Sequence, residues 1–253
     1  MSLLAVPALS DNYIWLCADA AGNAFAVDPG EAAPVQAALA QRDWRLRAIM
    51  LTHHHADHIG GAAELADATG AKVHAPIDAR IVRADVRVAD GDRIALAGSP
   101  FTFEVIAVPG HTRSHVAWFG HGLLFCGDTL FSVGCGRLFE GTPAQMLASL
   151  DRLAALPAAT RICCGHEYTL ANCAFARSVD PANAALAARE ASVREQRARG
   201  EPSLPALLGD ELACNPFLRV DAPALVAALP AADRVERFAR LRERKDGFRS
   251  VPA

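Results

Sequence analysis

The apolar positions in the first two-thirds of the chain form short runs separated by turn residues. Many of these runs are rich in β-branched and aromatic residues, and several are apolar at every position, as buried strands are. We therefore predict strands at residues 13–18, 24–30, 46–51, 71–75, 101–108, 115–120, 122–126 and 160–164. The first two form a hairpin, because Gly22 and Asn23 between them supply a turn.

Helical spacing of apolar residues occurs between these strands and dominates the chain after His166. It predicts helices at residues 33–41, 60–69, 142–156, 171–179, 182–200, 222–230 and 232–245. Thr142 before Pro143 is a favourable start for the third of them, and no convincing strand follows residue 167. The pattern predicts an α/β domain at 1–167 and a small helical domain at 168–253.

Composition narrows the classes of partner. The 253 residues are 52% hydrophobic, which is ample for a buried core. A net charge of −3 without any basic block argues against nucleic acid and against a membrane surface as partners. The first 16 residues lack a basic segment before their apolar positions, so we expect a cytoplasmic protein, and we expect it to be a monomer. Seven cysteines without a CxxC pair favour reduced, buried thiols.

The densest chemical signal is THHHADH at residues 52–58. Alternate side chains of an extended segment point the same way, so His53 and His55 can converge on one metal ion. His54 then points elsewhere and is expected either to be structural or to support one of the metal ligands. This spacing predicts a metal site rather than a surface cluster of histidines.

The chain must turn after the first histidine pair, because residues 60–61 are both glycine and a helical pattern follows. Asp57 and His58 are therefore aimed differently, and two differently aimed pairs suggest two metal ions. A catalytic ion needs about three protein ligands and an open position, so more ligands are required. Suitable side chains follow apolar runs at His111, Asp128 and His166. Asp128 is the best placed carboxylate to bridge two ions.

The ordered motifs THHHADH, PGHT, CGDTLF and CGHEY resemble those of the metallo-β-lactamase superfamily over about the first 167 residues. The resemblance implies a four-layer αβ/βα sandwich with a metal site at one edge. It also implies two divalent ions, one held by His53, His55 and His111, the other by Asp57, His58 and His166, with Asp128 bridging. Zinc is favoured, and iron and manganese are alternatives because the same ligands suit all three.

Such a centre makes hydroxide available at neutral pH, because bound metal lowers the pKa of its water toward about 7. Asp57 and Asp128 are expected to orient the bridging hydroxide, and the remaining positive charge suits a developing oxyanion. The superfamily includes hydrolases of lactams, lactones, thioesters and phosphodiesters as well as oxygenases. The metal motifs therefore do not identify the substrate.

Five further segments along the whole chain resemble the glyoxalase II family, the hydroxyacylglutathione hydrolases. They are SDNYIW at 10–15, GCGRLFEGT at 134–142, HEYTLAN at 166–172, NPFLR at 215–219 and RERKDGF at 242–248. The resemblance implies hydrolysis of S-D-lactoylglutathione to glutathione and D-lactate, the second step of methylglyoxal detoxification. A thiolate is a good leaving group, so no dedicated general acid is needed.

The family's glutathione contacts carry over to Arg137, Tyr168, Arg242 and Lys245. Arg137 stands where the family commonly has lysine, and Phe139 stands where many relatives carry tyrosine. We expect the activity to be kept and the affinity for glutathione to differ.

Two alternatives stay open at this point. A glutathione persulfide dioxygenase with one iron resembles this family and shares the histidine-rich motif, but it typically lacks the helical C-terminal domain. A non-catalytic, metal-dependent scaffold would keep the ligands for folding alone. Oxygen consumption with one iron per chain would favour the first, and glutathione binding without hydrolysis would favour the second.

Overall fold

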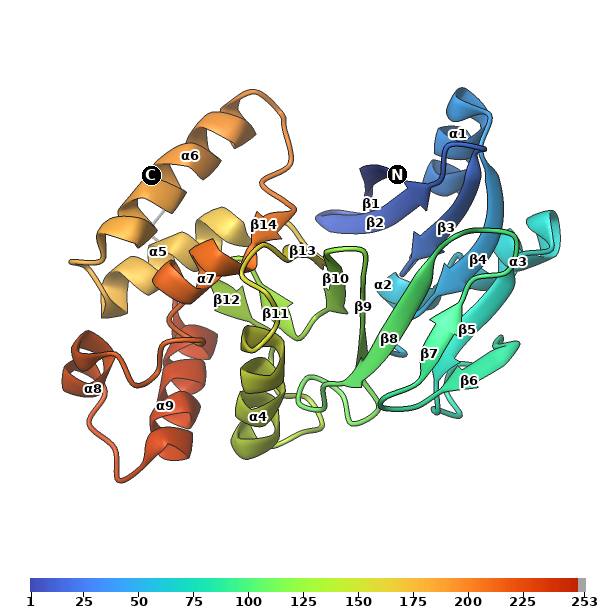
Figure 1. Cartoon of the computed structure of the whole chain (residues 1–253). Coiled ribbons are helices and arrows are strands. Elements are labelled where there is room, and N and C mark those ends of the chain that lie inside the picture. The colour runs from blue at the N-terminus through green and yellow to red at the C-terminus, as the bar shows by residue number, and fades with distance from the viewer. Residues whose placement is uncertain (250–253) are drawn as a thin grey trace. The chain divides into compact units, whose positions relative to one another are not determined.

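The computed structural model describes residues 1–249 and divides into two compact units, each built from separate segments of the chain (Figure 1). The first unit comprises Met1–Ala107, Ser114–Gly127 and Cys163–Glu167, and the second comprises Val108–Arg113, Asp128–Ile162 and the chain from Tyr168. The domain division expected at residue 167 stays a prediction. Residues 250–253 of the expected helical domain lie outside the described part.

The first unit contains a six-stranded sheet in sequence order. Its strands are β1 (Ser2–Ala8), β2 (Asn12–Ala18), β3 (Asn23–Val27), β4 (Arg45–Met50), β5 (Lys72–Pro76) and β6 (Val86–Val88). β1 to β3 are antiparallel, whereas β3 to β6 run parallel. α1 (Ala33–Arg42) and α3 (Ala62–Thr69) make the first two parallel crossovers, and both bury apolar side chains in the core of this sheet.

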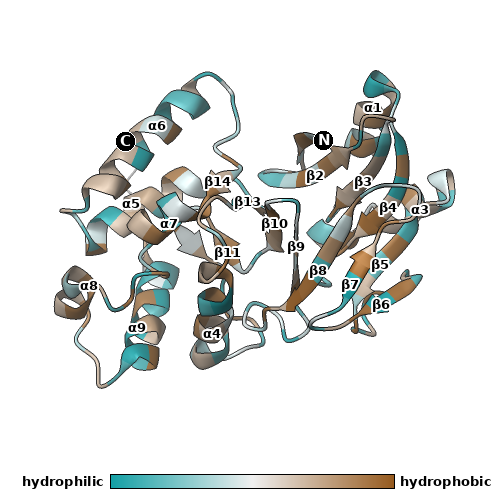
Figure 2. Ribbon diagram, in the orientation of Figure 1, coloured by the Kyte–Doolittle hydropathy of each residue, from teal (hydrophilic) through white to brown (hydrophobic). Residues whose placement is uncertain are grey.

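Four antiparallel strands of the first unit form most of a second sheet: β7 (Arg93–Ala95), β8 (Thr102–Ala107), β9 (Val116–Gly120) and β10 (Leu123–Gly127). The end of β13 (Arg161–Cys164) lies beside β10. Phe25 of the first sheet makes edge contacts with Phe103 and Phe125 of the second, with ring centroids 5.1 and 5.8 Å apart. Hydrophobic residues run along the strands of this unit (Figure 2). This core holds the loops from which the site residues project.

The second unit is mostly helical. Its helices are α4 (Pro143–Ala154), α5 (Thr169–Val179), α6 (Ala184–Ala198), α7 (Leu208–Cys214), α8 (Pro223–Ala228) and α9 (Arg234–Gly247). The short strands β11 (Leu130–Phe131) and β12 (Gly134–Cys135) form a hairpin, and β14 (Ala206–Leu207) pairs with the first residues of β13. Phe217 packs between Phe175 and Phe238 in the core.

The predicted strands and helices are present, with ends that differ by a few residues. Thr142 forms a capping box with Gln145 at the start of α4, and Pro143 occupies the first turn as expected. The short strands β6, β7, β11, β12 and β14, the edge strand β1 and the helices α2 (Ala56–Ile59) and α7 were not predicted. Two or three residues are too few for periodicity to detect. β14 corrects the expectation that no strand follows residue 167.

All seven cysteines are buried, as expected. Within residues 1–249, no helix combines the length and the hydrophobicity that crossing a bilayer would require.

Candidate active site

Five of the seven predicted metal ligands lie in the first unit, directly after strands or on a short helix. They are His53, His55, Asp57, His58 and His166. The first two follow β4, the next two belong to α2 (Ala56–Ile59), and the last follows β13. The THHHADH motif is therefore positioned by the end of β4, and His166 is positioned by the end of β13.

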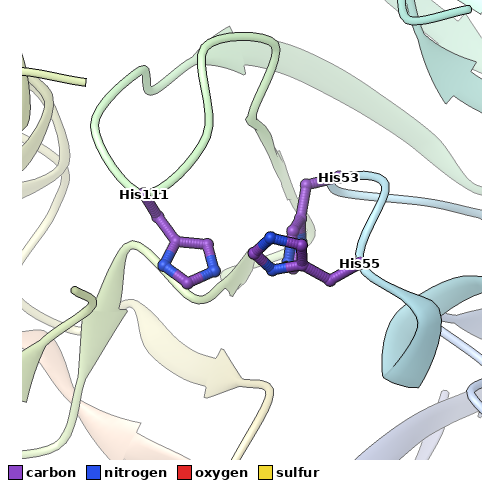
Figure 3. Close-up of side chains that lie close together, drawn as sticks. All are labelled: His53, His55 and His111. Carbon is purple, nitrogen blue, oxygen red and sulfur yellow. The ribbon is translucent and has the colours of Figure 1, made fainter. Parts of the chain in front are cut away.

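The rings of His53 and His55 converge, as strand alternation predicted (Figure 3). His53 Nε2 lies 3.1 Å from His55 Nδ1. The chain turns immediately afterwards at α2, which is earlier than the glycines that we expected to cause the turn. Gly60 and Gly61 instead allow close packing, because a Cβ on either would collide with the backbone of residues 30–32.

Asp57, His58 and His166 form the second group of ligand atoms in this unit. Asp57 Oδ2 lies 3.4 Å from His58 Nε2 and 3.4 Å from His166 Nε2. Two ligand atoms bound to one ion at 2.0–2.1 Å with tetrahedral angles are about 3.3 Å apart. The spacing therefore fits a divalent metal ion, and so does the spacing of the first histidine pair.

Carboxylates orient the histidines of the second group. His58 Nδ1 donates to Asp28 Oδ2 at 3.0 Å, and His166 Nδ1 donates to Asp11 Oδ1 at 2.7 Å. A proton held at Nδ1 leaves the lone pair at Nε2, which is the atom that faces Asp57. The tautomers thus suit metal binding.

Asp28 lies close enough to His53 and His58 to be considered a ligand itself. Its oxygens, however, also accept hydrogen bonds from the Thr52 backbone N–H and from Thr52 Oγ1, both at 2.7 Å. A buried carboxylate occupied by three donors serves better to orient histidine than to bind metal. Sequence reasoning missed this role, because it placed Asp28 in the strand predicted at 24–30, and His58 follows 30 residues later.

The other two histidines near the motif are placed outside these ligand groups. His54 Nδ1 lies 3.6 Å from Asp78 Oδ2, which agrees with the structural role among the two expected for it. The ring of His115 stacks on that of His53, with centroids 4.6 Å apart, and so helps to fix the orientation of this predicted ligand.

His111 and Asp128 belong to the second unit. His111, labelled in Figure 3 on the loop after β8, donates from Nδ1 to the backbone carbonyl of Arg137 at 2.9 Å. Its Nε2 lies 3.5 Å from Asp128 Oδ2, again the spacing of two ligands of one ion. Gly136 is required here, because a Cβ would overlap the backbone oxygen of Asp128.

A cavity of about 410 Å³ opens beside these two residues, within the second unit. All four predicted glutathione contacts line it: Arg137, Tyr168, Arg242 and Lys245. Three of them are cationic, so the cavity suits an anionic ligand. Asp246 is their acidic neighbour, 3.4 Å from Arg137 Nε and 2.9 Å from Arg242 Nη2.

The cations differ in how they present their charge. Lys245 lies over the rings of Phe175 and Phe248, and burial, reinforced by the nearby Arg242, lowers its pKa to about 8. Arg242 is only 5% exposed and donates to the Cys135 carbonyl at 2.7 Å. The charge of Lys245 can therefore change near pH 8. Arg242, by contrast, is buried and already donates to the protein.

Phe139 lies at the rim of the cavity and is 63% exposed. Its ring is 5.2 Å from that of His111, in an edge contact. An exposed phenyl ring offers an apolar surface there and no hydroxyl. The altered glutathione contact expected at this position stays a prediction.

Comparisons with known proteins cover nearly the whole chain. The family model described as metallo-beta-lactamase superfamily matches residues 11–166, and the model described as hydroxyacylglutathione hydrolase C-terminus matches residues 167–248. The hydroxyacylglutathione hydrolase of Xanthomonas campestris pv. campestris is 52% identical over 99% of this chain and 100% of its own length. That of Stenotrophomonas maltophilia is 50% identical over the same shares.

Solved structures show the same fold. ETHE1 from Myxococcus xanthus superposes with a TM-score of 0.69 at 26% identity, over 96% of this chain and 90% of its own. The BLEG-1 B3 metallo-β-lactamase gives a TM-score of 0.67 at 22% identity, over 86% and 100%. The mixed sheets and helices are thus the expected metallo-β-lactamase fold followed by a helical region.

The histidine and aspartate groups, in this fold, constitute a site for divalent metal. The C-terminal match also favours the hydrolase over the dioxygenase alternative, for which no such region is expected. Because relatives of 50–52% identity cover nearly every residue, the chain belongs to the hydroxyacylglutathione hydrolases, a family of the metallo-β-lactamase superfamily.

Proposed function

We propose that this enzyme hydrolyses S-(2-hydroxyacyl)glutathione, S-D-lactoylglutathione in particular, to glutathione and the 2-hydroxy acid, D-lactate. The observation that carries the proposal is the cavity of the second unit, which combines His111 and Asp128 with three cationic side chains. His111 and Asp128 have side chains of the kinds that hold catalytic metal ions in hydrolases. The three cations can pair with the carboxylates of glutathione.

The proposed metal centre holds two divalent ions. One is assigned to His53, His55 and His111, the other to Asp57, His58 and His166, with Asp128 shared between them. The ligand spacings and the protonated Nδ1 atoms within each unit support this assignment. When bound, such ions polarise a carbonyl and make water nucleophilic at neutral pH. Zinc is preferred, because nitrogen and oxygen ligands at tetrahedral spacing suit it, ahead of iron or manganese.

Asp57 and Asp128 are the catalytic carboxylates of this proposal. Each places an oxygen beside a histidine Nε2, where it can accept a hydrogen bond from the attacking water and orient it. Asn12 Nδ2 donates to Asp57 Oδ2 at 3.0 Å and holds that carboxylate in place. Asp57 is therefore a fixed acceptor despite the 39% exposure of its side chain.

The leaving group needs little help from the protein. A thiol with an ordinary pKa of about 8.5 leaves readily as thiolate, so a general acid is dispensable. Covalent catalysis by the cysteine that lines the cavity is disfavoured, because burial raises the pKa of Cys135 to about 11. Attack by water is the simpler route.

Substrate binding is assigned to Arg137, Tyr168, Arg242 and Lys245. Arg137 is 60% exposed at its side chain and Lys245 is half-buried, so both can meet a glutathione carboxylate. Tyr168 lies 5.2 Å from the Phe131 ring, at the cavity wall. Arg242 is buried, so we expect it to contribute to binding mainly by donating to the Cys135 carbonyl and to Asp246, and less by contacting glutathione directly.

The test is steady-state hydrolysis of S-D-lactoylglutathione, with metal analysis on the same sample. We expect turnover and two metal ions per chain. Oxygen consumption with glutathione persulfide at one iron per chain would overturn the thioesterase in favour of a dioxygenase. Glutathione binding without hydrolysis of any acyl-glutathione would favour a scaffold. The monomeric state and the cytoplasmic location stay predictions.

A further inference from the structure

The turn between β11 and β12 is an unusual piece of backbone at the wall of the cavity. Val133 in this turn has φ 58°, the left-handed region that β-branched residues strongly disfavour. Its side chain is fully buried in a cluster with Cys173, Ala176, Leu186 and Cys214. Such a conformation persists only when surrounding groups determine it.

Two buried side chains of α7 and its C-cap bind this turn. Glu211 accepts from Ser132 Oγ at 2.6 Å and from the Val133 backbone N–H at 2.7 Å. Asn215 donates from Nδ2 to the backbone carbonyls of Phe131 and Gly134, at 3.1 and 3.0 Å. We call these two residues the clasp.

The clasp is fully inaccessible to solvent, and among residues 1–249 no Lys, Arg or His nitrogen forms an ion pair with Glu211. Arg189 donates to Ser132 Oγ at 3.0 Å, and its charge offsets part of the effect of burial on the pKa of Glu211. Burying a carboxylate without a paired cation is unfavourable for stability, and burial raises the pKa of Glu211 accordingly. An apolar side chain would leave the Val133 N–H and the Ser132 hydroxyl without this acceptor, so the carboxylate serves to fix the conformation of the turn.

The hairpin held by the clasp joins two parts of the proposed site. Asp128 lies just before β11, and Arg137 follows β12. The Arg137 backbone carbonyl accepts from His111 Nδ1, and its side chain lines the cavity. A shift of the turn would therefore move a substrate contact and the acceptor that orients a metal ligand.

We propose that Glu211, with Asn215, is a positioning residue for substrate binding, acting through the β11–β12 turn on Arg137. The clasp does not line the cavity and so touches no substrate. The inference rests on the proposed assignment of Arg137 to glutathione. It adds to that assignment a remote determinant in α7, buried behind the cavity wall.

The central variant is Glu211→Ala, which removes the two carboxylate oxygens that accept hydrogen bonds from the turn. Glu211→Gln is the conservative partner, because its amide oxygen can still accept from the Val133 N–H while its NH₂ donates to Ser132 Oγ. Asp180→Ala is the matched control: Asp180 is a buried carboxylate of the same unit, and its partners Arg219 and Asn183 lie outside the hairpin.

We expect Glu211→Ala to raise KM for S-D-lactoylglutathione about tenfold at a temperature where it is fully folded, since small misplacements weaken binding strongly. Glu211→Gln should stay within about twofold of wild type, and so should Asp180→Ala even if it loses as much thermal stability. Equal KM increases in Glu211→Ala and Asp180→Ala would overturn the proposal, as would a wild-type KM in Glu211→Ala.

Amide hydrogen exchange provides a readout that does not depend on catalysis. Residues 130–137 should exchange faster in Glu211→Ala and unchanged in Asp180→Ala. If Glu211→Ala does not fold, Ser132→Ala removes one hydrogen bond of the clasp and should raise both KM and exchange by a smaller factor, about threefold. Unchanged KM and exchange in Ser132→Ala would then refute the inference. A wild-type enzyme that hydrolyses no acyl-glutathione would instead contradict the proposed function, whatever the exchange data show.

Discussion

Lys245 gives a sharp test of substrate binding, because burial lowers its pKa to about 8, within the range of an enzyme assay. A group with that pKa is about 90% protonated at pH 7 and about 10% protonated at pH 9. The charge available to a glutathione carboxylate thus falls about ninefold to tenfold over this range. KM should rise about fivefold, because the uncharged side chain is expected to bind about tenfold more weakly and a tenth of the enzyme is still charged at pH 9. kcat should change less, because the contact is made equally before and during the reaction.

Two substitutions separate the charge from the side chain. Lys245→Met removes the charge at every pH and keeps most of the apolar stem. A hydrogen bond to a charged group contributes about 1.5–3 kcal/mol, and the partly open cavity favours the lower end. KM at pH 7 should therefore rise about tenfold, since 1.4 kcal/mol corresponds to a factor of ten. Lys245→Arg keeps its charge at all these pH values, so its KM should not vary with pH.

The assay is steady-state hydrolysis of S-D-lactoylglutathione between about pH 7 and pH 9, with metal content measured for each variant. Lys245→Arg is the control for all other titrations in the site. A wild-type KM that stays constant over this range would refute the reasoning. A rise that persists unchanged in Lys245→Arg would do so equally, because the titrating group would then lie elsewhere.

Three further predictions concern metal binding and stability. Asp28→Asn should lower metal affinity about 10- to 100-fold, because the amide NH₂ would favour the His58 tautomer that carries its hydrogen on Nε2. The fold should remain intact by circular dichroism. Unchanged affinity in a chelator competition would contradict this prediction. Thr142→Ala should lower the free energy of unfolding by about 1 kcal/mol in urea without changing KM, since it removes the capping box of α4. The wild-type free energy of unfolding should rise between about pH 8 and 10.5, where the unfolded chain binds more protons at Lys245 than the folded one; Lys245→Met should lack about 1–3 kcal/mol of this rise.

The main strands and helices were predictable because their apolar patterns are long enough to show a period. The capping box at Thr142 and the hairpin turn at Gly22 follow directly from local residue types. The edge strand β1 has an apolar run, but Pro7 within it argues against a paired strand, because proline is tolerated mainly at the edge of a sheet. α7 is seven residues long and includes Gly209, which weakens any helical signal.

The candidate ligands were also predictable, because histidine and aspartate in such spacing are distinctive. Their orienting partners were not. Asp28 and His58 are separated by 30 residues, and no local pattern links them. The acceptor for His111 is the backbone oxygen of residue 137, which every amino acid possesses, so no residue type could have marked it. The buried Glu211 gave no signal either, since a glutamate on a helix is usually exposed.

The position of Arg137 has a consequence for how this enzyme can diverge. Its main chain orients a proposed metal ligand while its side chain faces the cavity. Substitution at this position can therefore alter ligand preference while the carbonyl remains in place for His111. A one-residue insertion or deletion between β12 and residue 137 would displace both at once. Natural variation in this loop should thus favour exchanges of side chain over changes of length, which keeps chemistry constant while selectivity drifts.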